Sequence, residues 1–459
     1  MPQMPYASPT TGSRKLDRLD RAYLLDWYRD NRARSEALFD LLTPEAYYSR
    51  PIALRHPVVF YEGHLPAFSF NTLVKRGLGR PSIDERLEQL FARGIDPHES
   101  QAGRAGDGEA GWPARSVVRQ FAAEADRQVL DALATGDIER SGHPLLDRAE
   151  AAYCILEHEA MHQETLLYMW HRLPFEMKRR PEGYEPRVAA SAPVDEWVKL
   201  PEGPATLGGH PVDEPFTWDN ERLAHVVQVP AFRIARHDVT NARFMEFVDA
   251  GGYEDPRWWA AGDWDWLRHE RLSCPLFWER DGGTWWWRGM FDRVKLPEHW
   301  PVYVSQAEAS AYARWRGARL PTEAEYHRAA FGSPNGGERR HPWGDPPPAA
   351  QHGVFDFNSW DPEPAGSHPD GDSAWGIADL VGNGWEWTST MFAPFNGFAP
   401  LASYPEYSAD FFDGEHVVMK GASPVTSSRL IRPSFRNWFR ARYPYVYATF
   451  RCVKEGVPS

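Results

Sequence analysis

One stretch of the sequence, residues 153–170, carries the side chains best suited to bind a metal ion. No Gly or Pro interrupts it, and Ala, Leu, Met, Glu and Gln dominate, so we expect a single helix. His158 and His162 are four residues apart, which places both imidazoles on the same face of that helix, one turn apart. Two imidazoles directed at one point would supply half of the ligands of a metal ion.

A chance pair of histidines, on the surface or in the core, is the alternative reading of this spacing. Burial of two imidazoles without a partner would be costly, and the stretch contains four apolar residues that would bury the helix: Leu156, Leu166, Leu167 and Met169. Glu157, Glu159 and Glu164 are also close in sequence, and a carboxylate commonly accepts the second N–H of a ligating imidazole. Both observations favour a metal site.

A third histidine, His64, lies within another apolar segment. Pro57 suits the first turn of a helix, so a helix is predicted from there to about residue 74, despite an internal glycine and an internal proline. A single histidine in such an element is usually a hydrogen-bonded core residue. With a pair of histidines in the same bundle, His64 becomes the best third ligand, and His56 is the reserve candidate.

The first domain is predicted to be a four-helix bundle, with helices at about residues 16–43, 57–74, 115–135 and 144–171. A loop rich in Gly, Ala and charged residues, 97–111, precedes the third of these helices. Inward-pointing histidines on different helices are a recurrent way to build a metal site in the core of a bundle. Four prolines between residues 174 and 193 mark a linker, so we expect this domain to cover residues 1–185.

The sequence changes character from Trp197 onward. Short strands, predicted at 205–209, 224–229 and 417–421, alternate with turns rich in Gly, Pro, Asn and Asp, and two clear helices are predicted, at 241–248 and 306–315. Most of the 21 tryptophans follow residue 255, which indicates a loop-rich domain packed by aromatic side chains. Residues 186–459 are therefore predicted to form an irregular α+β domain.

Length and charge agree with this division. A chain of 459 residues is too long for one ordinary core, so two domains are expected. The net charge of -13 argues against nucleic acid or an anionic membrane as partner, because both require a basic face. No apolar run approaches a membrane span and no signal-peptide core follows Met1, so we expect a cytoplasmic protein that acts on small molecules.

The three cysteines, Cys154, Cys274 and Cys452, are far apart and form no CxxC pair. The sequence therefore suggests neither a disulfide framework nor a thiolate zinc site. Cys154 lies one turn before His158, and we expect it to be a small buried side chain.

Four motifs in the second half resemble the signature blocks of the formylglycine-generating-enzyme-like fold, a C-type-lectin-related α+β domain: RLPTEAEY at 319–326, HPWGD at 341–345, GNGWEWT at 382–388 and FRC at 450–452. Upstream, His64 with His158-x-x-x-His162-x-Glu164 resembles the iron site of a DinB-like bundle. Together the two halves are similar to the non-haem iron sulfoxide synthases of ergothioneine and ovothiol biosynthesis, over nearly the whole chain.

The resemblance implies an Fe(II) site made by His64, His158 and His162, with positions left open for substrate and O2. It also implies that Asn437 and Trp438 contact the betaine end of hercynine, where an indole face against a trimethylammonium group is a sound cation–π arrangement.

Three further residues take roles from the same resemblance. Tyr404 and Tyr407 match the active-site tyrosines, one of which donates a proton during oxygen chemistry. Met161 stands where related enzymes often have a Gln near the substrate imidazole, and its thioether is compatible with a soft chalcogen, although a packing role is the alternative.

The sequence departs from the family pattern where a γ-glutamylcysteine donor would bind. Phe439 and Tyr443 stand in place of an Asp and an Arg, so the charges that would hold an amino-acid donor are replaced by aromatic rings. An aromatic wall suits a sugar. Segments 60–68 and 90–97 look most like the branch that includes selenoneine synthases, which implies Fe(II)- and O2-dependent C–Se bond formation between hercynine and a selenosugar, through a selenoxide, on the way to selenoneine.

Three alternatives remain open at this point. The nearest is an ergothioneine-type sulfoxide synthase that joins cysteine or γ-glutamylcysteine to hercynine. Another is a DinB-type thiol transferase with zinc in the same three histidines. The third is a non-enzymatic lectin-like binder, although structural metal sites normally have four protein ligands and the sequence offers three good ones. Copper-dependent formylglycine generation is disfavoured, because Cys452 has no second cysteine nearby.

Overall fold

The computed structural model describes residues 19–92, 111–188, 191–210 and 214–456. The chain divides into two compact units. The first, here called the helical unit, ends at Gly183 and also includes the short segment Leu401–Pro405; the second unit contains the rest of the chain from Tyr184 onward. Part of the predicted first helix (16–18), most of the predicted loop (97–110) and residues 93–97 of the 90–97 segment lie outside the described residues.

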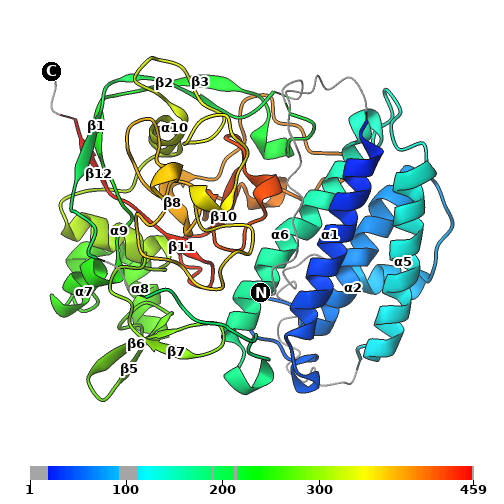
Figure 1. Cartoon of the computed structure of the whole chain (residues 1–459), viewed down its shortest axis with the longest axis horizontal. Coiled ribbons are helices and arrows are strands. Elements are labelled where there is room, and N and C mark those ends of the chain that lie inside the picture. The colour runs from blue at the N-terminus through cyan, green and yellow to red at the C-terminus, as the bar shows by residue number, and fades with distance from the viewer. Residues whose placement is uncertain (1–18, 93–110, 189–190, 211–213, 457–459) are drawn as a thin grey trace. The chain divides into compact units, whose positions relative to one another are not determined.

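The helical unit is built from four long helices that run side by side in Figure 1: α1 (Arg21–Asp40), α2 (Val58–Ser69), α5 (Arg115–Thr135) and α6 (Glu150–Arg172). The four predicted helices are confirmed. Helix α6 begins later than residue 144, because Arg148 and Ala149 adopt left-handed backbone angles, with φ of 53° and 56°, immediately before it. A short helix that the sequence analysis did not predict, α3 (Glu85–Phe91), follows an Asp84 N-cap.

Helix α2 is buried on all sides. Every residue from Val58 to Ser69 except Phe68 is buried, which is the pattern of a helix in the middle of a core. The helix tolerates Pro66 and continues without a break into η2 (Phe70–Gly77), a π-helical segment. The central position of α2 places His64 inside the bundle.

Helix α6 is tied to α1 by buried polar groups. The carboxylate of Glu159 accepts hydrogen bonds from Arg32, at 2.8 Å, and from the Ser35 hydroxyl, at 2.7 Å. Arg32 also pairs with Asp126 of α5, at 2.9 Å. Glu159 is therefore turned toward α1, and the expectation that it would orient a ligating imidazole is wrong. Its ion pair instead sets how α6 packs.

The second unit contains small sheets joined by long connections. A four-stranded sheet has the order β10–β9–β8–β11, from β8 (Gly384–Met391), β9 (His416–Ala422), β10 (Asn437–Arg440) and β11 (Ala448–Thr449). A three-stranded sheet has the order β1–β4–β12, from β1 (Trp197–Leu200), β4 (Phe232–Ala235) and β12 (Val453–Glu455). Two further antiparallel sheets complete the strands of the described residues. One pairs β2 (Gly203–Leu207) with β3 (His225–Val229), and the other has the order β5–β6–β7, from β5 (Trp278–Asp281), β6 (Thr284–Arg288) and β7 (Arg293–Lys295).

Four α-helices accompany these sheets in the described part of the second unit: α7 (Asn241–Asp249), α8 (Ala261–Glu270), α9 (Gln306–Trp315) and α10 (Glu323–Phe331). The prediction of α7 and α9 is confirmed, but the expectation of two helices is wrong. Helix α10 has a readable start signal, since Thr322 and Glu325 form a capping box. Both missed helices are short, so apolar periodicity alone gives a weak signal.

The motif residues of the second unit meet in its core. Arg451 is fully buried and donates hydrogen bonds to Glu386 on β8, at 2.6 Å, and to Asp238, at 2.9 Å. It also donates to the backbone carbonyl of Ala378. The FRC and GNGWEWT motifs therefore join sequence-distant segments of the fold. Among the helices of the described residues, none is both long and apolar enough to cross a membrane.

The α1–α6 ion pair makes a stability prediction. Replacing Arg32 by Leu leaves the buried Glu159 carboxylate without its charge partner, so we expect the free energy of unfolding to fall by about 3–5 kcal/mol. Urea denaturation of the full chain, followed by circular dichroism, measures this. Arg29→Leu on the same helix is the matched control, because its pair with Asp26 is exposed and should matter little. Adding Glu159→Leu should recover most of the loss. An Arg32→Leu variant as stable as Arg29→Leu would contradict this account.

Candidate metal centre

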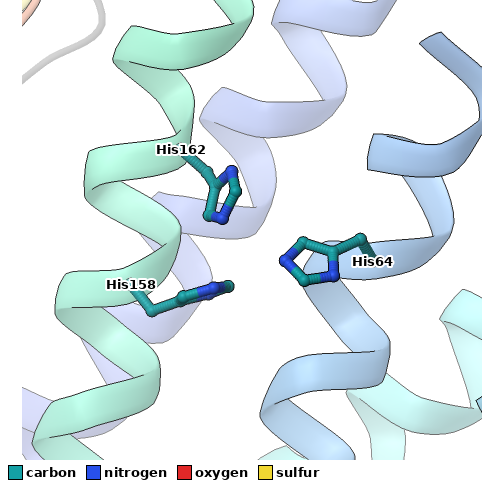
Figure 2. A group of neighbouring side chains, drawn as sticks. All are labelled: His64, His158 and His162. Atoms are coloured by element: carbon teal, nitrogen blue, oxygen red, sulfur yellow. The ribbon is translucent and has the colours of Figure 1, made fainter. Parts of the chain in front are cut away.

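The structure brings the three predicted ligands together. His64 projects from α2 and His158 and His162 project from α6, and Figure 2 shows the three rings turned toward one another. One nitrogen from each ring lies within 4.8 Å of the others. The ring centroids are 5.2 Å apart for His64 and His158, 4.9 Å for His64 and His162, and 4.4 Å for His158 and His162. All three side chains are buried.

These imidazoles carry nitrogen atoms that are buried and lack a hydrogen-bond partner: Nε2 of His64, Nδ1 of His162 and both nitrogens of His158. Burial lowers the pKa of His64 to about 4. Burial, and then the neighbouring histidines, lower the pKa of His158 well below its usual value, and burial with His64 does the same for His162. All three rings are therefore neutral near pH 7, with lone pairs available to a metal.

The donor set fits a divalent transition metal. Neutral imidazoles suit both Fe(II) and Zn(II), and buried unpartnered nitrogens converging from two helices are what such an ion would satisfy. Within the described residues the cluster comprises these three ligands, so a bound ion would keep positions for other molecules. That arrangement is typical of a catalytic rather than a purely structural metal site.

A backbone carbonyl orients His64. Its Nδ1 lies 2.7 Å from the carbonyl oxygen of Phe91, the last residue of α3. A carbonyl can only accept, so Nδ1 carries the hydrogen and Nε2 presents its lone pair. No sequence signal could have identified this partner, since any residue at position 91 offers the same backbone oxygen.

Aromatic side chains from α2 cover the rings. Phe68 stacks on His158, with centroids 3.5 Å apart and planes at 11°, and Phe60 stacks on His64, at 4.9 Å and 21°. The spacing 60, 64 and 68 places these residues on one face of the helix. Phe60 and Phe68 keep the site apolar, which strengthens any interaction between a metal ion and its ligands. The sequence shows this spacing of four residues, which could have predicted that both rings lie beside His64.

Of the two candidate tyrosines, Tyr404 belongs to the helical unit. Its ring centroid lies 5.8 Å from that of His158 and 5.1 Å from that of Phe68. Arg76 of η2 holds the preceding residues by donating to the carbonyls of Ala402, at 2.9 Å, and Ser403, at 3.3 Å. The Ser403 hydroxyl also donates to Glu150 at the start of α6, at 2.9 Å. The segment 401–405 is thus anchored at two points beside the histidines.

Tyr407 lies in the second unit. It stacks on Trp218, with centroids 3.9 Å apart, and its ring meets that of Trp438 edge-on at 5.1 Å. Trp438 in turn stacks on Phe392, at 4.1 Å and 6°. The structure therefore groups Tyr407 with the predicted hercynine residue Trp438, and Tyr404 with the histidines.

The remaining predicted site residues fall into separate places. Side chains alternate along strand β10, so Trp438 points to one side while Asn437 and Phe439 point to the other. Phe439 stacks on Tyr443, at 5.0 Å and 17°. The Asn437 side-chain oxygen accepts the backbone N–H of Trp438, at 2.9 Å. Met161 is half-buried on α6, within the turn between the two histidines.

The fold and this site define a protein with a cluster of three buried histidines in a helical bundle, followed in the chain by a mixed α+β domain. Comparison with protein families supports that description. Residues 28–166 match the DinB superfamily, and residues 184–456 match the sulfatase-modifying factor enzyme 1-like domain. The predicted fold class, a DinB-like bundle followed by a formylglycine-generating-enzyme-like domain, is confirmed.

Curated relatives narrow the assignment. Hercynine oxygenase of Mycolicibacterium thermoresistibile is 40% identical over 374 residues, which is 78% of this chain and 78% of that protein. Hercynine oxygenase of Mycolicibacterium smegmatis is 39% identical over 301 residues, 62% of this chain and 67% of the relative. Ergothioneine biosynthesis protein 1 of Schizosaccharomyces pombe is 28% identical over 456 residues, 90% of this chain and 54% of the relative. The chain belongs to the ergothioneine-type sulfoxide synthase family.

The lowered histidine pKa values predict a pH dependence of stability. The unfolded chain has a His64 pKa near 6.5 and the folded one a pKa of about 4, so the unfolded state binds more protons in this range. The free energy of unfolding of the metal-free protein should therefore fall as the pH is lowered from about 6.5 to 4, by up to about 3 kcal/mol for this group. Urea unfolding at a series of pH values measures the slope.

The control for this experiment is a second histidine. His269→Gln removes a side chain that is 85% exposed and should leave the slope unchanged, whereas His64→Gln should flatten it. An equal slope in the wild type and His64→Gln would contradict the assignment of a buried, neutral imidazole.

Proposed function

We propose that this protein is an Fe(II)- and O2-dependent enzyme that joins a chalcogen donor to the imidazole ring of hercynine. The observation that carries the proposal is the group of three buried, neutral imidazoles, each with at least one nitrogen that lacks a hydrogen-bond partner, in a chain whose relatives include hercynine oxygenases. Three protein ligands would leave positions on the ion for O2 and substrate.

His64, His158 and His162 would hold the iron, which when bound would supply the activation of O2. The neutral state of the rings favours this role, because a ligating nitrogen must be free of a proton. Phe60 and Phe68 stack on the rings and exclude water from one side of the group. The apolar lining limits side reactions with solvent.

Tyr404 is the better candidate for the proton donor. Its ring lies beside His158, and Arg76 and Glu150 fix the segment that carries it. A hydroxyl held in this way could donate a proton to oxygen chemistry at the histidine group. Tyr407 is assigned a different role, since it packs against Trp218 and Trp438 in the second unit.

Trp438 would bind the betaine end of hercynine, whereas the predicted partner Asn437 points to the other side of β10 and accepts the Trp438 backbone N–H. The indole of Trp438 is fixed in orientation by parallel stacking on Phe392, with the edge of Tyr407 nearby. A trimethylammonium group against the uncovered part of an indole face is stabilised by cation–π attraction. This placement supports recognition of a betaine and agrees with the names of the relatives.

For the donor we propose a selenosugar. Phe439 and Tyr443 form a stacked pair, a surface that suits a sugar ring better than an amino-acid zwitterion. The neighbouring cations are already engaged, since Arg440 pairs with Glu415 and Arg442 pairs with Asp263. A γ-glutamylcysteine donor would find no charge partner in this pair of rings. The product would be a selenoxide on the way to selenoneine.

A thiol donor is the second candidate, and a specific observation favours it. One relative is named ergothioneine biosynthesis protein 1, and ergothioneine is a sulfur compound. With cysteine or γ-glutamylcysteine as donor, the same iron site and hercynine site would give a sulfoxide.

Reconstitution separates these candidates. Full-length protein loaded with Fe(II) should consume O2 and hercynine, and mass spectrometry should detect a C–Se product with a selenosugar and little product with cysteine or γ-glutamylcysteine. Product from a thiol alone would replace the selenosugar by the second candidate. His158→Ala should reduce O2-dependent turnover to that of the metal-free protein. Bound zinc with O2-independent thiol transfer would refute the oxygenase proposal in favour of a DinB-type transferase.

The two tyrosines make a separate prediction. Tyr404→Phe removes the proposed proton donor but keeps the ring against Phe68, so kcat should fall about 10²–10⁴-fold with little change in the KM for hercynine. Tyr407→Phe is the matched control and should lower kcat far less. Iron content, measured by elemental analysis, should stay the same in both variants. A larger loss of kcat in Tyr407→Phe would reverse the assignment.

A further inference from the structure

We propose that Gly63, Phe91 and Glu88 are positioning residues for His64, which fix its tautomer before any metal binds. The proposal concerns helix α3, which the sequence analysis did not predict and which carries no metal ligand. It rests on the proposed metal site only for its consequence, the affinity for the ion.

A hydrogen bond joins the last carbonyl of α3 to the ring of His64. The last carbonyls of a helix have no partner within the helix. The Phe91 carbonyl, at the end of α3, lies 2.7 Å from Nδ1 of His64 and accepts a hydrogen bond from it. Nδ1 must carry the hydrogen, and the lone pair of Nε2 is then directed into the histidine group. The end of a seven-residue helix thus selects one of the two neutral forms of the ring.

Gly63 allows α3 to approach α2 closely. A Cβ atom built on Gly63 would lie 2.4 Å from Cζ of Phe91 and 2.5 Å from Cε1 and Cε2 of the same ring. The Phe91 ring therefore rests directly on the backbone of α2, one residue before His64. Glycine is unfavourable in the middle of a helix, and this close approach is what its missing side chain permits.

Glu88, in the middle of α3, anchors the helix. Glu88 is buried, and its carboxylate accepts hydrogen bonds from the Ser82 hydroxyl, at 2.6 Å, and the Ile83 backbone N–H, at 2.7 Å. Its second oxygen pairs with Lys75 of η2, the continuation of the helix that bears His64. Glu88 lies one turn before Phe91, so the carbonyl and the imidazole are held in one rigid frame.

Nuclear magnetic resonance tests the tautomer without metal. Long-range ¹H–¹⁵N correlation spectra of the metal-free, full-length protein should show His64 protonated at Nδ1, with His64→Gln used to assign the signal. Gly63→Ala should displace Phe91 and give a mixture of the two neutral forms. A wild-type ring protonated at Nε2, or an unchanged Nδ1–H form in Gly63→Ala, would overturn the proposal.

Titration with Co(II), a spectroscopic probe for the site, tests the consequence. Gly63→Ala should lower the affinity about 10–100-fold, the usual effect of losing a partner of a ligating histidine. The cost should disappear in the Phe91→Ala background, because the added methyl group then has room while the backbone carbonyl remains. An equal cost with and without the Phe91 ring would contradict the role of the close approach.

Glu88→Gln provides a variant that leaves Gly63 and Phe91 intact. It weakens the pair with Lys75, so it should lower Co(II) affinity by a smaller factor and shift the His64 signal in the same direction as Gly63→Ala. No change in either readout would remove Glu88 from the proposal. Failure of the wild type to bind Co(II) or Fe(II), with His64 still in its Nδ1–H form, would instead refute the proposed function and leave the orientation of the ring standing.

Discussion

The desolvation of three imidazoles is the constraint on which the helical unit depends. Bringing His64, His158 and His162 into an apolar core costs free energy unless the rings are neutral and their nitrogens find partners. The fold meets the first requirement by burial itself, which lowers all three pKa values. It meets the second only in part, through the Phe91 carbonyl. The unsatisfied nitrogens that remain are the feature that a metal ion would complete, and the proposed chemistry follows from them.

The surrounding structure serves to hold this costly group in place. Helix α2 is buried along nearly its whole length and supplies both a ligand and the rings that cover the site. Helix α6 is fixed against α1 by the buried ion pair between Glu159 and Arg32. Glu159 follows His158 in sequence, but its side chain points toward α1. The segment 401–405 reaches this unit from the second half of the chain and brings Tyr404 to the histidines. Of two adjacent residues on α6, His158 therefore belongs to the histidine group and Glu159 packs the helix against α1.

In the second unit, too, the residues that stabilise the fold differ from the residues proposed to bind substrate. The motifs that identify its fold place Arg451, Glu386 and Asp238 in a buried ion-pair group. The aromatic residues proposed for substrate lie elsewhere, on and around the short edge strand β10. The family motifs therefore belong to the scaffold, whereas the proposed choice of donor rests on Phe439 and Tyr443.

Sequence alone determined the main helices, the change to an irregular second domain, and His158 and His162 as a pair, because helical periodicity and i, i+4 spacing are local properties of the chain. His64 joined them only through the expectation that both helices belong to one bundle. The sequence could not determine which groups become partners in the folded protein. Glu159, adjacent to His158, turned out to bind Arg32, and Tyr404 and Tyr407, three residues apart, belong to different units. The partner of His64 is a backbone oxygen, which any residue at position 91 would offer. Such choices depend on packing between distant segments, which only the tertiary structure decides.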